Sequence, residues 1–254
     1  MVADIWTLCQ GTKHICFIHK TAWRIVEAQE MTATRKLVDS LEEQMILEDL
    51  IEAQKPSLPL EYLEYHPLLY TPFRYPPLKY GSRFGKKIEP ALWYGSLELN
   101  TAFCEKAFYL FNFINASDAQ FGIVSPQFTA FSVQVKSSKG IQLNSRAFSH
   151  YTSLISKPNS YQASQALGAA MREAEIKVFT YFSARDKNKG VNVGLFTPKA
   201  FLYKHPDEAS FQSWQCFATK EMIEFSKISA MRVESKMYLV DQFKVGSVLP
   251  FPAG

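Results

Sequence analysis

Strand-like periodicity recurs along the chain. The residues from Ile15 to Val26 alternate and cluster as in a strand, with Arg24 inside the otherwise apolar run 22–26. Further strands are predicted at 92–95, 128–135, 176–182, 191–196, 214–217, 222–225 and 237–240. Because strands are many and helices few and unevenly placed, the pattern predicts an α+β fold rather than a series of βαβ units.

Three segments have a helical period, at 34–54, 97–115 and 161–174. The first carries an apolar stripe and ends at Lys55-Pro56, so we expect an N-terminal helical arm that packs on the core or docks a partner or a second copy. The second is apolar almost all round, Phe113 included, which is typical of a buried helix. Its only charges between 101 and 115 are Glu105 and Lys106.

The segment 56–90 differs in composition from the rest of the chain. It holds seven of the 13 prolines and five of the 12 tyrosines. Because proline at this density is incompatible with a regular helix, we predict a long extended segment that lies over the core and is anchored by aromatic rings.

Composition bounds the class of protein. The chain has 254 residues, of which 47% are hydrophobic, 14% aromatic and 20% charged, and this excludes a disordered protein. We expect one compact unit, with residues 1–60 as the N-terminal strand and arm and 61–254 as the catalytic domain. No stretch approaches the ~20 apolar residues of a membrane span, and the first residues lack the pattern of a signal peptide, so we expect a cytoplasmic protein without a membrane partner.

Charge and cysteine content narrow the choice of ligand only slightly. A net charge of +4 suits an anionic small ligand as well as nucleic acid. The four cysteines are scattered and are expected to be reduced. The group Cys9, His14, Cys16 and His19 fits no standard zinc spacing, so we expect no metal site.

The chemistry-bearing residues form a spaced set. Arg83, Tyr94 and Glu105 stand eleven residues apart, and the segments 181–185 and 190–198 follow much later. Nucleotide-binding glycine loops, zinc-protease motifs and the serine elbow of α/β-hydrolases are absent from the sequence. The set, with Ser183 in the first later segment, resembles the RES-domain family, named for its Arg, Glu and Ser.

The resemblance implies a fold and an activity. The best-known RES proteins are bacterial toxins that destroy NAD⁺, and their fold is a split β-sandwich of the ADP-ribosyltransferase type around an NAD⁺ cleft. NAD⁺ is then a substrate rather than a resident cofactor, and inorganic phosphate is a candidate co-substrate. The partner implied is a separate Xre-like antitoxin chain that blocks the cleft, so that nucleic acid is met only through the antitoxin. A homodimer stays open.

Roles follow from the chemistry of breaking a bond between ribose and a cationic leaving group. That transition state resembles an oxocarbenium ion, which a carboxylate such as Glu105 would stabilise. Arg83 is the candidate for the pyrophosphate, and Arg24 is a second candidate for phosphate or for an anionic nucleophile. Tyr94 would stack on nicotinamide or bond to ribose, and Ser183 would orient the ribose. Tyr80 joins the expected NAD⁺-binding residues.

Plainer interpretations stand beside these roles. Arg83 and Glu105 would be a structural ion pair, Tyr94 a core aromatic, Ser183 a strand-end hydrogen bonder, and Arg24 a structural residue. Among functions, NAD⁺ phosphorolysis is favoured over hydrolysis, since Arg24, Arg83 and Arg185 would make the site rich in arginine. Protein mono-ADP-ribosylation, a non-catalytic binding module and nucleic-acid binding are the alternatives. The sequence also departs from the family pattern at Gly85, where many members have asparagine.

Overall fold

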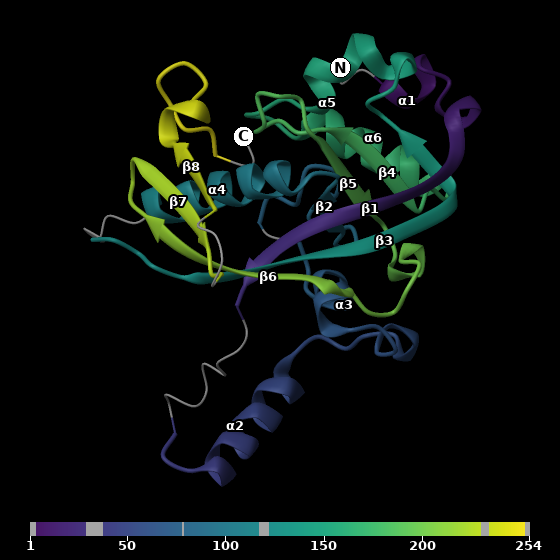
Figure 1. Cartoon of the computed structure of the whole chain (residues 1–254). Helices are drawn as coiled ribbons and strands as arrows, with labels where there is room; N and C mark the ends of the chain where they lie inside the picture. The colour runs from purple at the N-terminus through teal and green to yellow at the C-terminus, as the bar shows by residue number, and fades with distance from the viewer. Residues whose placement is uncertain (1–3, 29–37, 78, 117–121, 230–233, 252–254) are drawn as a thin grey trace.

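The computed structural model describes residues 4–28, 38–77, 79–116, 122–229 and 234–251 (Figure 1). One eight-stranded sheet runs in the order β1-β2-β5-β4-β3-β6-β7-β8. Its strands are β1 (Ile15–Glu27), β2 (Trp93–Ser96), β3 (Gln127–Gln142), β4 (Val178–Phe182), β5 (Val191–Leu195), β6 (Asp207–Ala218), β7 (Met222–Lys227) and β8 (Ser235–Leu239). The predicted α+β class is confirmed, while the ADP-ribosyltransferase type of sandwich stays a prediction.

Five of these strands close on themselves. β1 pairs antiparallel with β2 and also with β3, over a register from Ile15↔Ile141 to Glu27↔Phe128. β2 pairs with β5, β5 with β4, and β4 runs parallel to β3, which completes the circuit. β6, β7 and β8 extend from β3 as an antiparallel wing. The N-terminal strand is therefore an integral part of the sheet.

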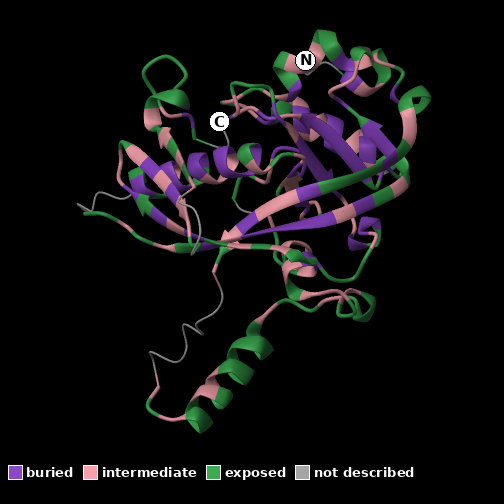
Figure 2. Cartoon of the chain, in the orientation of Figure 1, coloured by how far each residue is buried: buried purple, intermediate pink, exposed green. Residues whose placement is uncertain are grey.

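The described part of the chain has six α-helices, and all of them except α2 pack on the sheet. They are α1 (Ile5–Leu8), α2 (Leu41–Gln54), α3 (Pro67–Arg74), α4 (Leu99–Asn115), α5 (Thr152–Ile155) and α6 (Gln162–Glu173). Helix α4 lies along the β6–β8 wing, where Phe103 meets Trp214 and Phe225 at ring-centroid distances of 4.5 and 4.9 Å. Leu167 of α6 packs into a separate hydrophobic cluster that also contains Phe84 and Phe179. The buried faces of α4 and α6 are purple in Figure 2.

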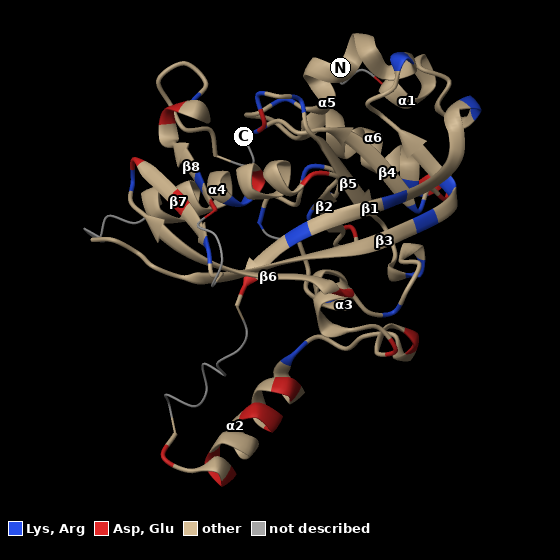
Figure 3. Ribbon diagram, in the orientation of Figure 1, with Lys and Arg blue, Asp and Glu red and all other residues tan. Residues whose placement is uncertain are grey.

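The helical arm does not pack on the core as expected. Of the range 34–54, residues 34–37 lie outside the described part of the chain, and the helix begins after Ser40, whose hydroxyl accepts a hydrogen bond from the Glu43 N–H. No residue of α2 is buried, and the helix projects from the body (Figure 1). All its charged side chains are acidic, as Figure 3 shows. An ion pair of 2.6 Å between Glu52 and Arg74 joins its end to α3.

Two further expectations were wrong. The segment 56–90 is not wholly extended, because α3 forms within it. Pro67 is tolerated because it occupies the first turn, where no intrahelical donor is needed, and the His66 ring accepts a hydrogen bond from the Leu68 N–H. Pro72 lies inside the same helix. Helix α4 is not buried all round either, since Phe113 is 68% exposed. No helix among the described residues is long and apolar enough to cross a bilayer.

Candidate active site

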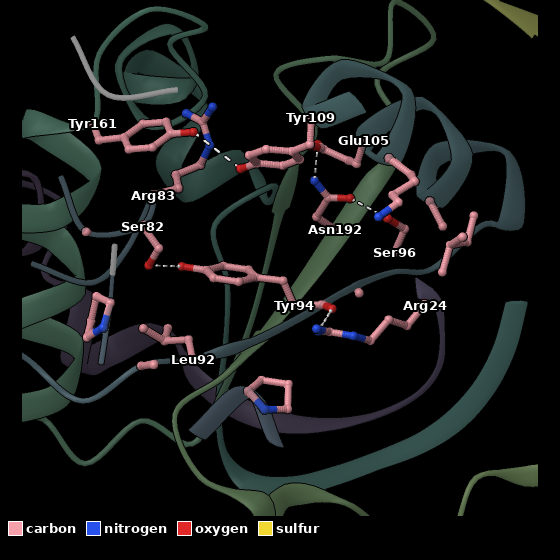
Figure 4. A pocket seen from close by; sticks show the side chains of 18 of the residues that line it. Arg24, Ser82, Arg83, Leu92, Tyr94, Ser96, Glu105, Tyr109, Tyr161 and Asn192 are labelled. Atoms are coloured by element: carbon pink, nitrogen blue, oxygen red, sulfur yellow. Dashed lines mark hydrogen bonds between the residues drawn. The ribbon is translucent and has the colours of Figure 1, made fainter. Parts of the chain in front are cut away.

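A pocket of about 730 Å³ opens where β1, β2, β5 and α4 meet the loop before β2 (Figure 4). Its volume is in the range of cavities that enclose small-molecule ligands. All of these elements except β5 contribute a side chain that the sequence analysis singled out. They are Arg24 from β1, Arg83 from the loop, Tyr94 from β2 and Glu105 from α4. The predicted set therefore lies together in space.

Two neutral donors hold the carboxylate of Glu105. Ser183 Oγ and Asn192 Nδ2 both donate to Glu105 Oε1, each at 2.6 Å. Among the described residues, Glu105 accepts only these two hydrogen bonds, and both end on Oε1. None of the described lysines or arginines forms an ion pair with Glu105. Oε2 is thus left for a ligand, and the interpretation of Arg83 and Glu105 as a structural ion pair is wrong.

Ser183 lies behind Glu105 rather than against the pocket. It follows β4 directly and is 7% exposed. Its hydroxyl accepts hydrogen bonds from the backbone N–H groups of Arg185 and Asp186, both at 3.0 Å, while its one proton goes to Glu105. A hydroxyl used in this way positions the carboxylate, so the expected contact of Ser183 with ribose does not fit the geometry.

Arg83 is buried at one wall of the pocket. Its Nη1 donates to the carbonyl oxygens of Lys157 at 2.9 Å and Ile155 at 3.4 Å. The guanidinium lies 4.7 Å from the ring centroid of Tyr161 (Figure 4). No described carboxylate pairs with it, although the side chain is only 7% exposed. A buried cation held by carbonyls and a ring, with its charge uncompensated, favours an anionic ligand.

Tyr94 secures the loop that carries Arg83. Its hydroxyl is 2.9 Å from Ser82 Oγ and accepts a hydrogen bond of 3.1 Å from the Phe84 N–H. Burial raises the pKa of Tyr94 to about 12, so the phenol stays protonated at neutral pH. Since the hydroxyl is engaged on the loop, the ring is the part of Tyr94 that a ligand in the pocket meets.

A second cationic wall lies on the β1 side. Arg24 Nη1 donates to the Tyr94 carbonyl at 2.8 Å, its Nε has no partner among the described residues, and burial lowers its pKa to about 10. Lys106, next to Glu105 on α4, also lines the pocket, and burial lowers its pKa. Neither forms an ion pair with a described carboxylate. Two adjacent half-buried cations that form no ion pair among the described residues favour a bound anion.

Of two further residues expected near the site, Tyr80 and Arg185, only Tyr80 lines the pocket. The Tyr80 carbonyl accepts a hydrogen bond from Gln165 at 2.9 Å. Arg185 does not line it, because its guanidinium is turned away over the ring of Phe108, at 3.4 Å from the centroid, and donates to the Pro158 carbonyl. The site is thus less rich in arginine than expected.

The sequence analysis missed the amide that completes the carboxylate's support. Asn192 is 2% exposed, donates to Glu105 and accepts a hydrogen bond of 2.7 Å from Ser96 Oγ. Its signal was present, since it is the one polar side chain within the strand Val191–Leu195. A buried amide in an apolar strand needs partners, and these turn out to be site residues.

No cluster of three or more metal-ligating side chains occurs in the described part of the chain. Cys9 and Cys16, from the group weighed as a zinc site, are free thiols there. The site as described is one carboxylate, two cationic walls and several aromatic rings. Such a site suits an anionic ligand with a carbon centre that becomes positive during reaction.

Comparison with known families fits this geometry. The model of the RES domain matches residues 60–215, more than half of the chain. The chain belongs to the RES-domain family. The matched RES region contains Arg83, Tyr94, Glu105 and Ser183, and it also contains Asn192. Arg24 lies outside it, on the strand that closes the ring.

Among solved structures, this RES protein is similar to the MbcT–MbcA toxin–antitoxin complex of M. tuberculosis. The identity is 11%, the TM-score is 0.43, and the likeness covers 76% of this chain and 81% of that chain. No curated protein sequence matches.

Proposed function

We propose that this RES protein consumes NAD⁺ by breaking the bond between nicotinamide and ribose, and that it acts as a toxin. The observation that carries the proposal is the carboxylate of Glu105, which lines the pocket and is fixed through Oε1 by Ser183 and Asn192. Membership of a family whose best-known members destroy NAD⁺ supports the substrate. The uncompensated cations around the pocket match a pyrophosphate.

The chemistry follows from the arrangement. The bond between ribose C1′ and the nicotinamide nitrogen breaks, and its electron pair leaves with neutral nicotinamide. Positive charge develops on C1′ and the ring oxygen, where the negative charge of Glu105 stabilises it. An oxygen of phosphate or of water then bonds to C1′, giving ADP-ribose phosphate or, after loss of a proton, ADP-ribose.

Arg24 and Lys106 favour phosphate as the acceptor. Both line the pocket together with Glu105, and an anion between them would balance two half-buried positive charges. Water needs no such wall. Phosphorolysis is therefore the first expectation and hydrolysis the second, with transfer to a protein side chain as the third outcome of the same assay.

The test is incubation of the purified protein with NAD⁺, with and without inorganic phosphate, and mass spectrometry of the products. Glu105→Gln should lower nicotinamide release roughly 10²–10³-fold, the size of effect seen when one charge-stabilising group is removed. Glu98→Gln is the matched control, since Glu98 is an exposed carboxylate at the start of the same helix and does not line the pocket. NAD⁺ left intact by the unmodified protein under both conditions would refute the proposal.

The proposed partner is a separate antitoxin chain that covers the pocket. If so, cleavage is inhibited by that chain, and co-expression with it should restore growth of cells that make this protein. Growth that is unaffected by the protein alone, at a level where NAD⁺ is cleaved in lysates, would remove the toxin role and leave the enzyme.

A further inference from the structure

One part of the pocket lining is not used by the cleavage chemistry. It consists of a short run before Arg83 and one residue near the C-terminus: Tyr75, Pro76, Pro77, Lys79, Tyr80 and Phe251. Its aromatic side chains are unusually open to solvent, with Tyr75 42%, Tyr80 48% and Phe251 54% exposed. Exposed rings gathered at a pocket mouth indicate a surface for a flat ligand.

Phe251 reaches this mouth on an anchored segment. Phe243, 5% exposed, packs against Phe108 and Phe111 of α4 at centroid distances of 6.0 and 5.6 Å. A turn closed by Val245 and Val248 follows, and Pro250 is buried again. The backbone is therefore held up to the residue before Phe251, while the ring of Phe251 itself projects.

The ring of Phe251 meets a ring that is 171 positions away in the sequence. Tyr80 and Phe251 form an edge-to-face pair with centroids 5.8 Å apart and planes at 81°. Lys79 Nζ lies 5.3 Å from the centroid of the Tyr80 ring. Rings beside an ammonium group suit a ligand that is aromatic and anionic at once, and a nucleotide has both properties.

We propose that Tyr80 and Phe251 bind the adenine base of NAD⁺, with Phe251 as a specificity-determining residue supplied from outside the RES region. This inference rests on the proposed function. Arg83, three residues after Tyr80, lines the same pocket as Glu105 and offers its cation to the pyrophosphate of the dinucleotide. The base would thus be held by the two rings, and the reacting ribose would lie at Glu105.

The test compares two substrates with the same scissile bond. NAD⁺ carries the adenine base, whereas nicotinamide mononucleotide lacks it. Phe251→Ala should raise KM for NAD⁺ roughly 5- to 30-fold, which corresponds to about 1–2 kcal/mol of lost stacking. KM for nicotinamide mononucleotide should stay within twofold. Phe251→Tyr should keep the KM for NAD⁺ of the unmodified protein, since tyrosine has a ring of the same size.

Val248→Ala is the control, because Val248 is 66% exposed on the same segment and does not line the pocket. A KM for NAD⁺ in Phe251→Ala equal to that of Val248→Ala would overturn the inference. So would an equal rise for both substrates, since the ring would then close the pocket without binding the base. These results leave NAD⁺ cleavage by the unmodified protein intact, so the proposed function survives them.

Failure of the proposed function gives a different result. If the unmodified protein cleaves neither substrate, NAD⁺ binding is measured by calorimetry on the unmodified protein and on Phe251→Ala. An affinity that falls 5- to 30-fold in the variant supports the base site without cleavage. Absence of binding, or equal affinity in both proteins, overturns the base site as well.

Discussion

Loss of the amide that holds Glu105 should impair catalysis without unfolding the protein. Asn192→Ala removes one of the two hydrogen bonds to Glu105 Oε1, at 2.6 Å, and leaves the hydroxyl of Ser96 without its acceptor. A hydrogen bond to a charged group contributes about 1.5–3 kcal/mol. If that energy is realised in the transition state, kcat/KM for NAD⁺ falls roughly 10- to 150-fold.

The assay separates orientation of the carboxylate from binding. Nicotinamide release is followed at varied NAD⁺ concentration, and the loss should appear in kcat, because Asn192 acts through Glu105. Asn188→Ala is the control, since Asn188 is exposed and lies on the loop that precedes the same strand. An unchanged kcat in Asn192→Ala, with a melting temperature equal to that of the control, would refute the reasoning.

The second donor to Glu105 allows a double-mutant cycle. Ser183→Ala removes the other hydrogen bond to the same oxygen. Because either donor alone still restrains the carboxylate, the double variant should lose more activity than the sum of the two single losses in free energy. If the two single losses in free energy simply add in the double variant, the two donors do not act together through the orientation of Glu105.

Three further outcomes follow from burial and charge. Tyr94→Phe should lower stability by about 1–3 kcal/mol in urea unfolding, because it leaves the Phe84 N–H unpaired, whereas Tyr203→Phe, at an exposed ring, should not. Burial raises the pKa of Tyr94 from 10.0 to about 12, so between these pH values the folded protein keeps a proton that the unfolded chain gives up. The free energy of unfolding should therefore fall as pH rises from 10 to 12, and it should fall less steeply in Tyr94→Phe. Phe103→Ala should lower the free energy of unfolding by about 3–5 kcal/mol, since Phe103 is fully buried. Leu50→Ala should lower it by under about 0.5 kcal/mol, since Leu50 is 59% exposed. A melting temperature of Leu50→Ala that depends on protein concentration would instead indicate a dimer through α2.

The spacing of Arg83, Tyr94 and Glu105 predicted their meeting in one pocket because local structure largely determines it. Tyr94 is in β2, and α4 begins three residues after that strand, so the strand end and the first turns of the helix are necessarily neighbours. The hydroxyl of Tyr94 then binds the loop before β2, and the carbonyls of Lys157 and Ile155 hold Arg83 itself at the same place. Their roles toward NAD⁺ stay predictions.

The rest of the site depends on contacts distant in sequence. Asn192 meets Glu105 across 87 residues and Ser96 across 96, through pairings of β5 that no local pattern specifies. Phe251 reaches Tyr80 only because its segment packs on α4. Periodicity predicts which face of an element is apolar, but it does not predict which other element covers that face. For the same reason periodicity did not decide whether α2 packs on the core or is an arm that docks a partner or a second copy.

The closed circuit of strands also bears on when activity begins during synthesis. β1 emerges from the ribosome first, but its main partner β3 begins 100 residues after β1 ends, so the ring cannot close early. Asn192 of β5 follows Arg24 by 168 residues, which is roughly 10–30 s of translation at about 5–20 residues per second. An unfinished chain therefore has an incomplete pocket throughout this interval. If the proposed function holds, an antitoxin partner has that time to bind before the pocket is complete.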